Sequence, residues 1–519
     1  MADITVNEAL YKENGSLLDE EDLMAWTPIG NETVKFEGEF DGNGKKIINL
    51  YLNDTEAYYV GLFGYVNNAS IYDVTIKDSY ISGYQYVGSI AGYAKGSNIK
   101  NCVNESKIIC SKKYVGGILG YASDCTIENC SNKKSINYGT EYIGGIAGYV
   151  DKSTVNNCTN NADIQSTYST QGGIAGHSQN STVTNCVNTG NIGNDDSYAN
   201  IGGIIGYAST TSTNVVSCYN TGIITGDIYI GGIIGSSSYS GIEKSYNTGA
   251  VYGSEYVGGL AGNSSGTINN SYNIATVSGT DYVGGIAGLK TYKSITNCYN
   301  MGKVSASGVA GGIAGDNSNL SLNCFYLKTD SINTNLDGEG NRADKRTMTE
   351  AKPLSAFTTG EIAYRLEENN DDVVWGQNLK ESDSDTEYDE YPVLSGATVY
   401  ATTPCYSGYS NQSLESSTKA HTFENGFCTE CGALDEPNLN ADGFYEISHA
   451  GQLYWFSVKV NSGKKDLKGK LINSIVVNNN VLSGGELVAD TTNLREWFPI
   501  GNEDYAFEGE FDGNGQQIK

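Results

Sequence analysis

The sequence predicts an all-β fold, a parallel β-helix (β-solenoid) of about ten coils of about 28 residues, followed by small capping and cysteine-rich modules. Three observations support this prediction. A short glycine-rich phrase recurs ten times, cysteine and asparagine residues recur in phase with it, and no segment of the repeat shows helical periodicity. A period this regular is typical of stacked repeats, in which each coil buries its apolar face against its neighbours.

The phrase has the common form apolar-Gly-Gly-Ile-Ala-Gly, and its copies start 26 to 30 residues apart. A β-propeller blade needs about 40 residues, so this spacing disfavours a propeller and favours the rungs of a parallel β-helix. Ten rungs at ~4.8 Å would make a rod on the order of 50 Å long. The copies begin at Val60, Val87, Val115, Ile143, Gln171, Ile201, Ile230, Val257, Val283 and Ala310.

Each coil is predicted to hold three short strands separated by turns. In the coil that starts at Tyr114, we expect one strand over residues 114–121, which contain the whole phrase, and a second over residues 126–132. A third short strand is centred on Ile136. The glycine pair in the phrase would allow close turns and dense stacking of the backbone.

Two residue types recur at fixed phases of the coil. Cysteine at one phase indicates an inward position, and asparagine two residues later could bond its side-chain amide to the neighbouring rungs and adopt a left-handed backbone. We predict that the cysteines are free, buried thiols, because parallel side chains on adjacent rungs do not present their sulfurs with the torsion that a disulfide requires. The cysteines are Cys102, Cys130, Cys158, Cys186, Cys218, Cys298 and Cys324, and the asparagines are Asn104, Asn132, Asn160, Asn188, Asn220, Asn247, Asn273 and Asn300.

The segments before and after the repeats predict the domain organisation. Residues 1–53 are expected to form an N-terminal cap with the first strands, with a tight hairpin turn at residues 41–44, because Gly and Asn tolerate positive φ. A calcium loop is disfavoured there, since its twelfth position is Leu52 rather than a glutamate. Residues 54–330 form the β-helix, and residues 331–404 form a C-terminal capping segment with a short helix, an acidic loop and strands.

Residues 441–519 repeat the beginning of the chain. Residues 507–515 carry the same nine amino acids as residues 36–44, at an offset of 471. We expect a second, truncated β-helix unit here, preceded by an amphipathic helix over residues 448–461 with Ser448 as its N-cap. Both ends of the sequence therefore resemble cuts through a larger array.

Composition and missing motifs narrow the functional classes. The net charge is −28, which should repel nucleic acid and anionic lipid, and no apolar run is long enough to span a membrane. The sequence has three histidines, and it lacks a His-Glu-x-x-His helix, a Gly-x-Ser-x-Gly elbow and a Walker loop. Intrinsic catalysis is therefore not expected.

The phrase Val-Gly-Gly-Ile-Ala-Gly, followed by Ile-x-Asn-Cys and Gly-x-Val, resembles the GLUG-motif repeats of large bacterial surface and secreted proteins. Some bacterial IgA-cleaving metallopeptidases also carry such repeats. The resemblance covers about residues 20–330. It implies a β-solenoid on an extracellular stalk or adhesin-like protein, and it implies no activity.

Residues 405–434 form a small Cys/His module. Cys428 and Cys431 stand in a Cys-x-x-Cys-Gly turn that could present two thiolates to one ion, and Cys405 and His421 would complete a tetrahedral site for structural zinc. A redox or disulfide pair, or free thiols, are the alternatives. Similar short cysteine modules occur beside GLUG arrays, so the resemblance favours zinc. No other cofactor is expected.

Tyrosines form two stripes, one immediately before the phrase (the upstream stripe) and one immediately after it (the downstream stripe). Such stripes could stack on sugars or dock a host or cell-surface protein, or the rings could stack on one another and shield the sheet. The upstream stripe comprises Tyr59, Tyr86, Tyr114, Tyr142, Tyr229, Tyr256 and Tyr282, and the downstream stripe comprises Tyr65, Tyr93, Tyr121, Tyr149 and Tyr207, with His177 between the last two.

These observations predict a non-catalytic extracellular repeat protein, an adhesin-like surface stalk or binding rod that contacts glycans or host protein through its tyrosine stripes. The alternative is the non-catalytic repeat region of a larger secreted enzyme, a peptidase or a glycan-degrading enzyme. The expected location is extracellular or at the cell surface, with the signal peptide and anchor expected to lie beyond the ends of this sequence.

Overall fold

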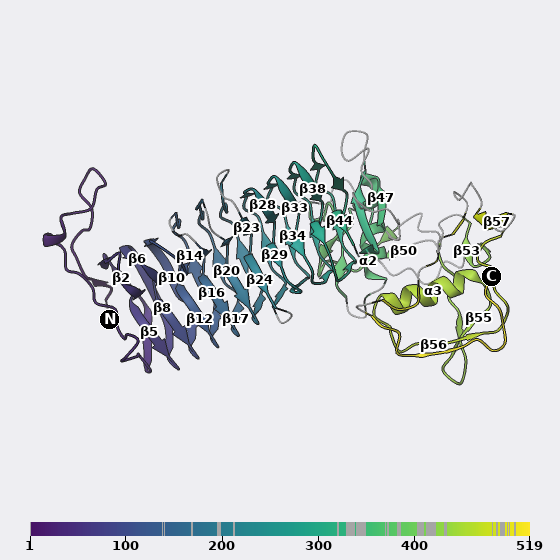
Figure 1. Ribbon diagram of the computed structural model, residues 1–519, viewed down its shortest axis with the longest axis horizontal. Coiled ribbons are helices and arrows are strands. Elements are labelled where there is room, and N and C mark those ends of the chain that lie inside the picture. The colour runs from purple at the N-terminus through teal and green to yellow at the C-terminus, as the bar shows by residue number, and fades with distance from the viewer. Residues whose placement is uncertain are drawn as a thin grey trace. The chain divides into compact units, whose positions relative to one another are not determined.

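The computed structural model divides into two compact units, Met1–Ala351 and Lys352–Lys519 (Figure 1). It describes residues 2–519 except 138, 140, 168–169, 195–198, 211–212, 319–320, 329–337, 339–348, 369, 371–372, 381–385, 402–408, 412–421, 430–432, 480, 484–485, 488–493, 496, 498 and 503–504.

The first unit is a parallel β-helix, as predicted. Strands at equivalent positions of successive rungs lie side by side and pair in parallel, which Figure 1 shows as a row of arrows along the unit. One ten-stranded sheet consists of β4 (Tyr58–Val60), β7 (Gln85–Gly88), β11 (Val115–Gly116), β15 (Tyr142–Gly144), β19 (Thr170–Gly172), β23 (Ala199–Gly202), β28 (Ile228–Gly231), β33 (Glu255–Gly258), β38 (Asp281–Gly284) and β43 (Ala310–Gly311).

A second ten-stranded sheet carries the end of each phrase. It consists of β5 (Phe63–Asn67), β8 (Ala91–Lys95), β12 (Leu119–Ser123), β16 (Ala147–Asp151), β20 (Ala175–Gln179), β24 (Ile205–Ser209), β29 (Ile234–Ser237), β34 (Ala261–Ser264), β39 (Ala287–Lys290) and β44 (Ala314–Asn317). The third short strand of the later coils forms a four-stranded sheet of β27 (Ile224–Thr225), β32 (Val251–Tyr252), β37 (Val277–Ser278) and β42 (Val304–Ser305).

The glycine-rich phrase is not one strand, contrary to the prediction for residues 114–121. It turns a corner between the two ten-stranded sheets, from β11 to β12. A Cβ atom on Gly117 would lie 2.2 Å from the carbonyl oxygen of Gly145 and 2.7 Å from the side chain of Asn132. The second glycine of the phrase is thus required where the corner packs against the asparagine ladder of its own rung.

The predicted strand over residues 126–132 is also two strands, β13 (Thr126–Glu128) and β14 (Ser131–Asn132). Asn129 separates them with a φ of 55°, a left-handed conformation that asparagine tolerates. The left-handed asparagine therefore lies one residue before the cysteine, and not in the ladder two residues after it. Equivalent left-handed residues include Asn101, Asn157, Asn185, Asn270 and Asn297.

The asparagine ladder runs through the interior and bonds adjacent rungs, as predicted. Nδ2 of Asn160 donates a hydrogen bond to Oδ1 of Asn188, and Nδ2 of Asn188 donates one to Oδ1 of Asn220, both at 2.7 Å. The ladder asparagines are fully buried, so this chain of amides satisfies polar groups that water cannot reach.

All seven ladder cysteines are buried, as predicted, and the prediction of free thiols is confirmed for Cys102, Cys130, Cys158, Cys186, Cys218 and Cys298. Each lies among the isoleucine and valine side chains of one continuous core. Burial also raises the pKa of the thiols of Cys110 and Cys125 to about 11, so both are protonated at neutral pH.

The predicted hairpin turn at residues 41–44 is wrong in one respect. Asn43 and Gly44 adopt positive φ, but the strand continues on both sides of them as β2 (Glu39–Ile48). Both parts pair in parallel with β6 (Ser70–Gly83), with a register shift between Asp41 and Lys45. The turn is a bulge within a rung rather than the end of a hairpin, because the next pairing partner is a whole coil away in the sequence.

The second unit begins with α1 (Leu354–Thr358) and α2 (Glu361–Glu367), which confirm the expected short helical segment. Further along, α3 (Ala450–Asn461) packs against a four-stranded sheet of β54 (Asn438–Leu439), β55 (Tyr445–Ile447), β56 (Lys468–Leu471) and β59 (Glu510–Asp512). Ser448 is not the N-cap of α3. That position belongs to His449, and the hydroxyl of Ser448 donates to Oε1 of Gln452 instead.

Candidate binding surface along the tyrosine stripes

Both tyrosine stripes lie at the corner formed by the phrase. The parallel register places each ring of the downstream stripe opposite its counterpart on the next rung, as in the pairs Tyr65–Tyr93 and Tyr93–Tyr121. The upstream tyrosines stand just before the apolar residue that opens the phrase. Six of them have φ between 52° and 64°, a left-handed conformation that is uncommon for tyrosine. They are Tyr59, Tyr86, Tyr114, Tyr229, Tyr256 and Tyr282.

The rings stack on one another along the β-helix, which confirms one of the two interpretations of the stripes. The ring centroids of Tyr93 and Tyr121 are 4.9 Å apart with 3° between the planes, and those of Tyr121 and Tyr149 are 4.8 Å apart with 7°. The two stripes also contact each other edge to face, as between Tyr114 and Tyr121 at 5.4 Å. Ring faces inside the stack are therefore covered by neighbouring rings.

The stripes are interrupted in the middle of the β-helix. His177 takes the place of a tyrosine, with its ring centroid 4.4 Å from that of Tyr149 and 4.9 Å from that of Tyr207. Beyond Tyr207 the downstream stripe stops, because Ser236 occupies the next position in register. Tyr229, Tyr256 and Tyr282 form a separate stack of the upstream stripe.

His177 is buried and neutral. Its Nε2 lies 2.7 Å from Oγ of Ser209, and burial lowers the pKa of the imidazole to about 4. Since desolvation disfavours the charged ring, His177 acts as a member of the aromatic stack and not as a proton donor at neutral pH.

A third tyrosine stack was not predicted from the sequence. Its tyrosines stand at the position immediately after that of the ladder cysteine, where four consecutive coils carry Tyr-Asn. The ring centroids of adjacent coils lie 4.8–4.9 Å apart, with planes within 5° of parallel. The recurrence of Tyr-Asn in the sequence was the signal that could have predicted this stack. The members are Tyr219, Tyr246, Tyr272 and Tyr299.

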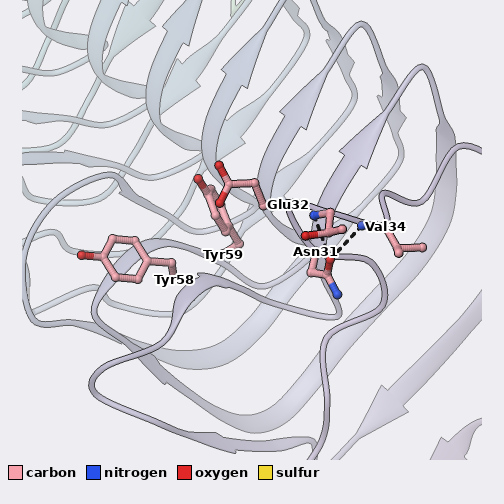
Figure 2. Close-up of a pocket in the computed structure, with 6 residues that line it drawn as sticks. Asn31, Glu32, Val34, Tyr58 and Tyr59 are labelled. Atoms are coloured by element: carbon pink, nitrogen blue, oxygen red, sulfur yellow. Dashed lines mark hydrogen bonds between the residues drawn. The ribbon is translucent and has the colours of Figure 1, made fainter.

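An open pocket of about 720 Å³ lies where the double stack begins (Figure 2). Tyr59 is the first ring of the upstream stripe and stacks face to face on Tyr86 at 5.0 Å. It also lines the pocket, together with Tyr58 and the loop that precedes β2. The pocket was not predicted from the sequence, where the available signal was that Tyr59 is the first tyrosine of the upstream stripe. The lining residues are Asn31, Glu32, Thr33, Val34, Tyr58 and Tyr59.

The loop over residues 31–34 is held by its own asparagine. Oδ1 of Asn31 accepts hydrogen bonds from the backbone N–H of Thr33 at 2.9 Å and of Val34 at 2.8 Å, drawn as dashed lines in Figure 2. This arrangement is an Asx turn, which fixes the loop without a partner elsewhere in the chain.

Glu32 gives the pocket a negative charge beside its aromatic rings, and Figure 2 shows its side chain next to Tyr59. The pKa of the Tyr59 hydroxyl is raised, first by burial and then by the Glu32 carboxylate. The pKa of Tyr65 is raised by burial and by the same carboxylate. Tyr58 is 53% exposed, so the pocket combines an accessible phenol, a half-buried phenol and a carboxylate. These groups can bind and orient a polar ligand.

The predicted metal ligands Cys405, His421 and Cys431 lie outside the described residues. Cys428 ends β53 (Phe427–Cys428) and is buried. Among the described residues, no three His, Cys, Asp or Glu side chains are grouped so that they could hold a metal ion. The Cys3His zinc site remains a prediction.

Residues 113–137 match the family model described as the GLUG motif. The chain carries the GLUG motif. The match spans the upstream tyrosine Tyr114, the corner at Gly117, the cysteine and asparagine ladders at Cys130 and Asn132, and the third strand position at Ile136. It therefore covers one coil of the β-helix, and the other copies of the phrase form equivalent coils around it.

Two known proteins are similar to parts of the chain. A stretch of 58 residues is 36% identical to a protein of Evansella cellulosilytica provisionally named a Gly-rich membrane protein, and it covers 11% of this chain and 7% of that protein. A crystal structure from Bacteroides ovatus, provisionally named an immunoglobulin A1 protease, is similar over 51% of this chain and 86% of its own, with 20% identity and a TM-score of 0.34. The helices of the described residues are too short or too polar to cross a bilayer.

Proposed function

We propose that this GLUG-repeat protein is a non-catalytic, adhesin-like rod at the cell surface or outside the cell, and that it binds glycans at the pocket where the double tyrosine stack begins. One observation carries the proposal. Tyr59 is stacked on Tyr86 from one side, and it borders an open pocket that also contains the Glu32 carboxylate.

Sugars need two kinds of contact, and the pocket offers both. An aromatic ring provides an apolar platform for the C–H face of a sugar, and a few well-placed polar groups orient its hydroxyls. Tyr58 and Tyr59 supply rings and hydroxyls, and Glu32 supplies a carboxylate that can accept hydrogen bonds. The negative charge favours neutral or cationic sugars over acidic ones.

The remaining rings serve better as support than as separate sugar sites. Tyr93 and Tyr121 are covered on their faces by the rings of adjacent rungs, and their edges contact the upstream stripe. Stacking on such a ring would require breaking the contacts between tyrosines. The stack instead holds its first ring rigidly, which lowers the entropic cost of binding.

Surface display is supported by the architecture. Parallel rungs form a stiff rod on the order of 50 Å long, and a site at one end of a rod stays accessible to a distant ligand. The name of the Evansella cellulosilytica relative, a membrane protein, agrees with a place at the cell surface.

A glycan array probed with the purified chain tests the proposal. We expect binding to a limited set of neutral or amino sugars, a loss of about tenfold or more in affinity for Tyr59→Ala, and a smaller loss for Glu32→Gln. Tyr256→Ala is the matched control, because it removes an interior ring of the separate stack and leaves the pocket intact.

Two results would contradict the proposal. One is the absence of glycan binding by the folded chain. The other is binding that Tyr59→Ala and Tyr256→Ala weaken equally, since this would place the ligand elsewhere on the rod or attribute the loss to general destabilisation.

A further inference from the structure

One rung in the middle of the β-helix, residues 170–192, differs from the adjacent rungs at three buried positions. We call it the boundary rung. Its phrase opens with Gln171, where both adjacent rungs carry isoleucine. His177 and Ser178 then replace a tyrosine and an apolar residue of both adjacent rungs. Gln171 and Ser178 are fully buried and His177 is 7% exposed, so three polar side chains stand where the adjacent rungs bury apolar or aromatic ones.

Two of these polar side chains keep a buried atom without a partner. Nε2 of Gln171 donates a hydrogen bond to the carbonyl oxygen of Ser166 at 2.8 Å. Nε2 of His177 lies 2.7 Å from Oγ of Ser209. Within the described part of the chain, however, Nδ1 of His177 and Oγ of Ser178 are buried without a hydrogen-bond partner. Such atoms destabilise the rung that buries them, because water satisfies them once the rung opens.

The boundary rung also interrupts the aromatic stacks. The rings of Tyr149 and Tyr207 contact His177 with 48° and 56° between the planes, whereas Tyr149 lies only 7° from the plane of the preceding ring in its stripe. In the upstream stripe, Thr170 stands in register with Tyr142 and supplies no ring. Among the described rings, no face-to-face pair therefore joins the rungs before the boundary rung to those after it.

Stacked tyrosines join the rungs on either side into two blocks. Both stripes stack across the rungs of residues 58–151, the first block. The upstream stripe and the third tyrosine stack join the rungs of residues 219–305, the second block. The stability of stacked repeats is approximately the sum of the rungs and of the contacts between neighbours. The boundary rung lacks the stacking contacts, although the asparagine ladder continues through it at Asn188.

We propose that the boundary rung is an acid-sensitive switch, at which the β-helix opens while the blocks on both sides stay folded. The asparagine ladder keeps the rung closed at neutral pH, and a proton on His177 favours the open form. This inference concerns the rod itself and does not depend on glycan binding.

The imidazole ring of His177 is surrounded by neutral groups. It contacts three phenol rings, and its Nε2 is within hydrogen-bonding distance of Oγ of Ser209. Burial raises the pKa of two of these phenols, Tyr142 and Tyr149, to about 12, so they stay neutral in acid. The third phenol is Tyr207.

Two carboxylates flank the strands that pack against β20, and both have other partners. Asp151 ends β16, and its Oδ1 accepts a hydrogen bond from Nδ2 of Asn180 at 3.5 Å. Glu141 precedes β15 and lies 3.6 Å from Nζ of Lys113. In the part of the chain that the structure describes, neither carboxylate forms an ion pair with His177. Neither therefore compensates the charge of a proton on the buried imidazole.

Acid acts on the boundary rung through the difference between a buried and an exposed imidazole. Burial lowers the pKa of His177 to about 4, whereas the pKa of an exposed histidine is about 6.5. Since opening exposes the ring to water, the open form binds the proton first as the pH falls. These two values make opening about twentyfold more frequent at pH 5 than at pH 7.

Hydrogen exchange of the full chain at pH 7 and pH 5, located by mass spectrometry of peptides, tests the proposal. After correction for the intrinsic exchange rate, we expect residues 170–192 to exchange faster than the rungs of either block at pH 5. Their rate should rise about twentyfold from pH 7 to pH 5, and the rates in the two blocks should change much less.

Two variants separate the weak rung from its response to acid. Gln171→Ile, His177→Tyr and Ser178→Ala together introduce the residues of the following rung, and we expect this triple variant to exchange slowly at both pH values. His177→Gln keeps a polar side chain that does not titrate. It should retain the faster exchange of the boundary rung and lose the rise between pH 7 and pH 5.

The matched control moves the same three residues into the first block. Val115→Gln, Tyr121→His and Ala122→Ser should make residues 115–136 exchange faster in acid, because these positions are equivalent to those of the boundary rung. The first two variants decide the proposal even if this control does not fold.

Three results would overturn the proposal. Residues 170–192 could be as protected as both blocks at pH 5, every rung could accelerate equally between pH 7 and pH 5, or the triple variant could retain the acid-dependent exchange. Acid-dependent exchange that is confined to the boundary rung and absent from the triple variant supports it, since a general effect of acid acts on all rungs alike.

Discussion

The ring of Tyr59 lies 5.0 Å from the ring of Tyr86, with 14° between their planes, and it is the first ring of the upstream stripe. Tyr86 and Tyr114 each have a stacked ring on both sides, whereas Tyr59 has one on one side only and borders a pocket. The tyrosines therefore have two proposed roles, support within the stack and binding at its start. Mutation can distinguish these roles.

The interior of the tyrosine stack should contribute more to stability than its end. Tyr121→Ala removes two face-to-face contacts and two edge contacts, and we expect it to lower the free energy of unfolding by about 2–4 kcal/mol. Tyr59→Ala removes one face-to-face contact and two edge contacts, so it loses one stacked pair fewer and should cost about 1 kcal/mol less. Urea unfolding monitored by circular dichroism measures both. Equal losses of unfolding free energy in the two variants would contradict the prediction that interior rings contribute more to stability than terminal ones.

The asparagine ladder should be sensitive to a single deletion. Asn188→Ala removes the donor to Gly190 and Asn220 and the acceptor from Asn160, all at 2.7 Å, and leaves their polar groups buried. We expect a loss of about 2–4 kcal/mol in the free energy of unfolding. Asn161→Ala, at the exposed neighbour of Asn160, should change it by no more than about 0.5 kcal/mol. If the two variants unfold at the same urea concentration, the ladder is not a major source of stability.

Burial of His177 predicts sensitivity to acid. Its pKa is about 4 in the folded state and near 6.5 in the unfolded state, so the unfolded state binds the proton first as the pH falls. Its contribution is complete above pH 6.5 and is lost progressively toward pH 4, by about 3 kcal/mol in total. His177→Tyr, which matches Tyr149 and Tyr207 on the adjacent rungs, should flatten this part of the stability curve. An unchanged slope between pH 6.5 and 4 in this variant would argue against the assignment.

Buried thiols predict sensitivity to alkali. Burial raises the pKa of Cys110 from 9.0 to about 11, so the stability that depends on its neutral form is present below pH 9 and declines as the pH rises toward 11. The decline should amount to about 3 kcal/mol for this residue. Cys110→Ala should lack this component, as judged from urea unfolding at pH 8.5 and 10.5. The tyrosines are the same in both proteins, so the difference between them isolates Cys110.

Periodicity was sufficient to predict the parallel β-helix, because the inward cysteines, the asparagine ladder and the ring stack are each the consequence of one residue recurring at one phase. It did not show where the strands break. Residues 114–121 look like one strand in sequence, but the backbone turns at Gly117. A Cβ atom there would lie 2.2 Å from the carbonyl oxygen of Gly145 on the next rung, so the corner requires glycine. Contacts between rungs are not visible within a single coil.

The amino-acid sequence by itself determined the repeat, the identity of the inward residues and the recurrence of the opening block at residues 507–515, since these depend only on local pattern and phase. The tertiary structure decided which surfaces remain unoccupied. The pocket beside Tyr59 is bordered by the loop over residues 31–34 in place of a second stacked ring of the upstream stripe. Tyr86, at the equivalent position of the next rung, is covered by the ring of Tyr114, so the accessibility of a ring in the stripe follows from packing and not from its identity.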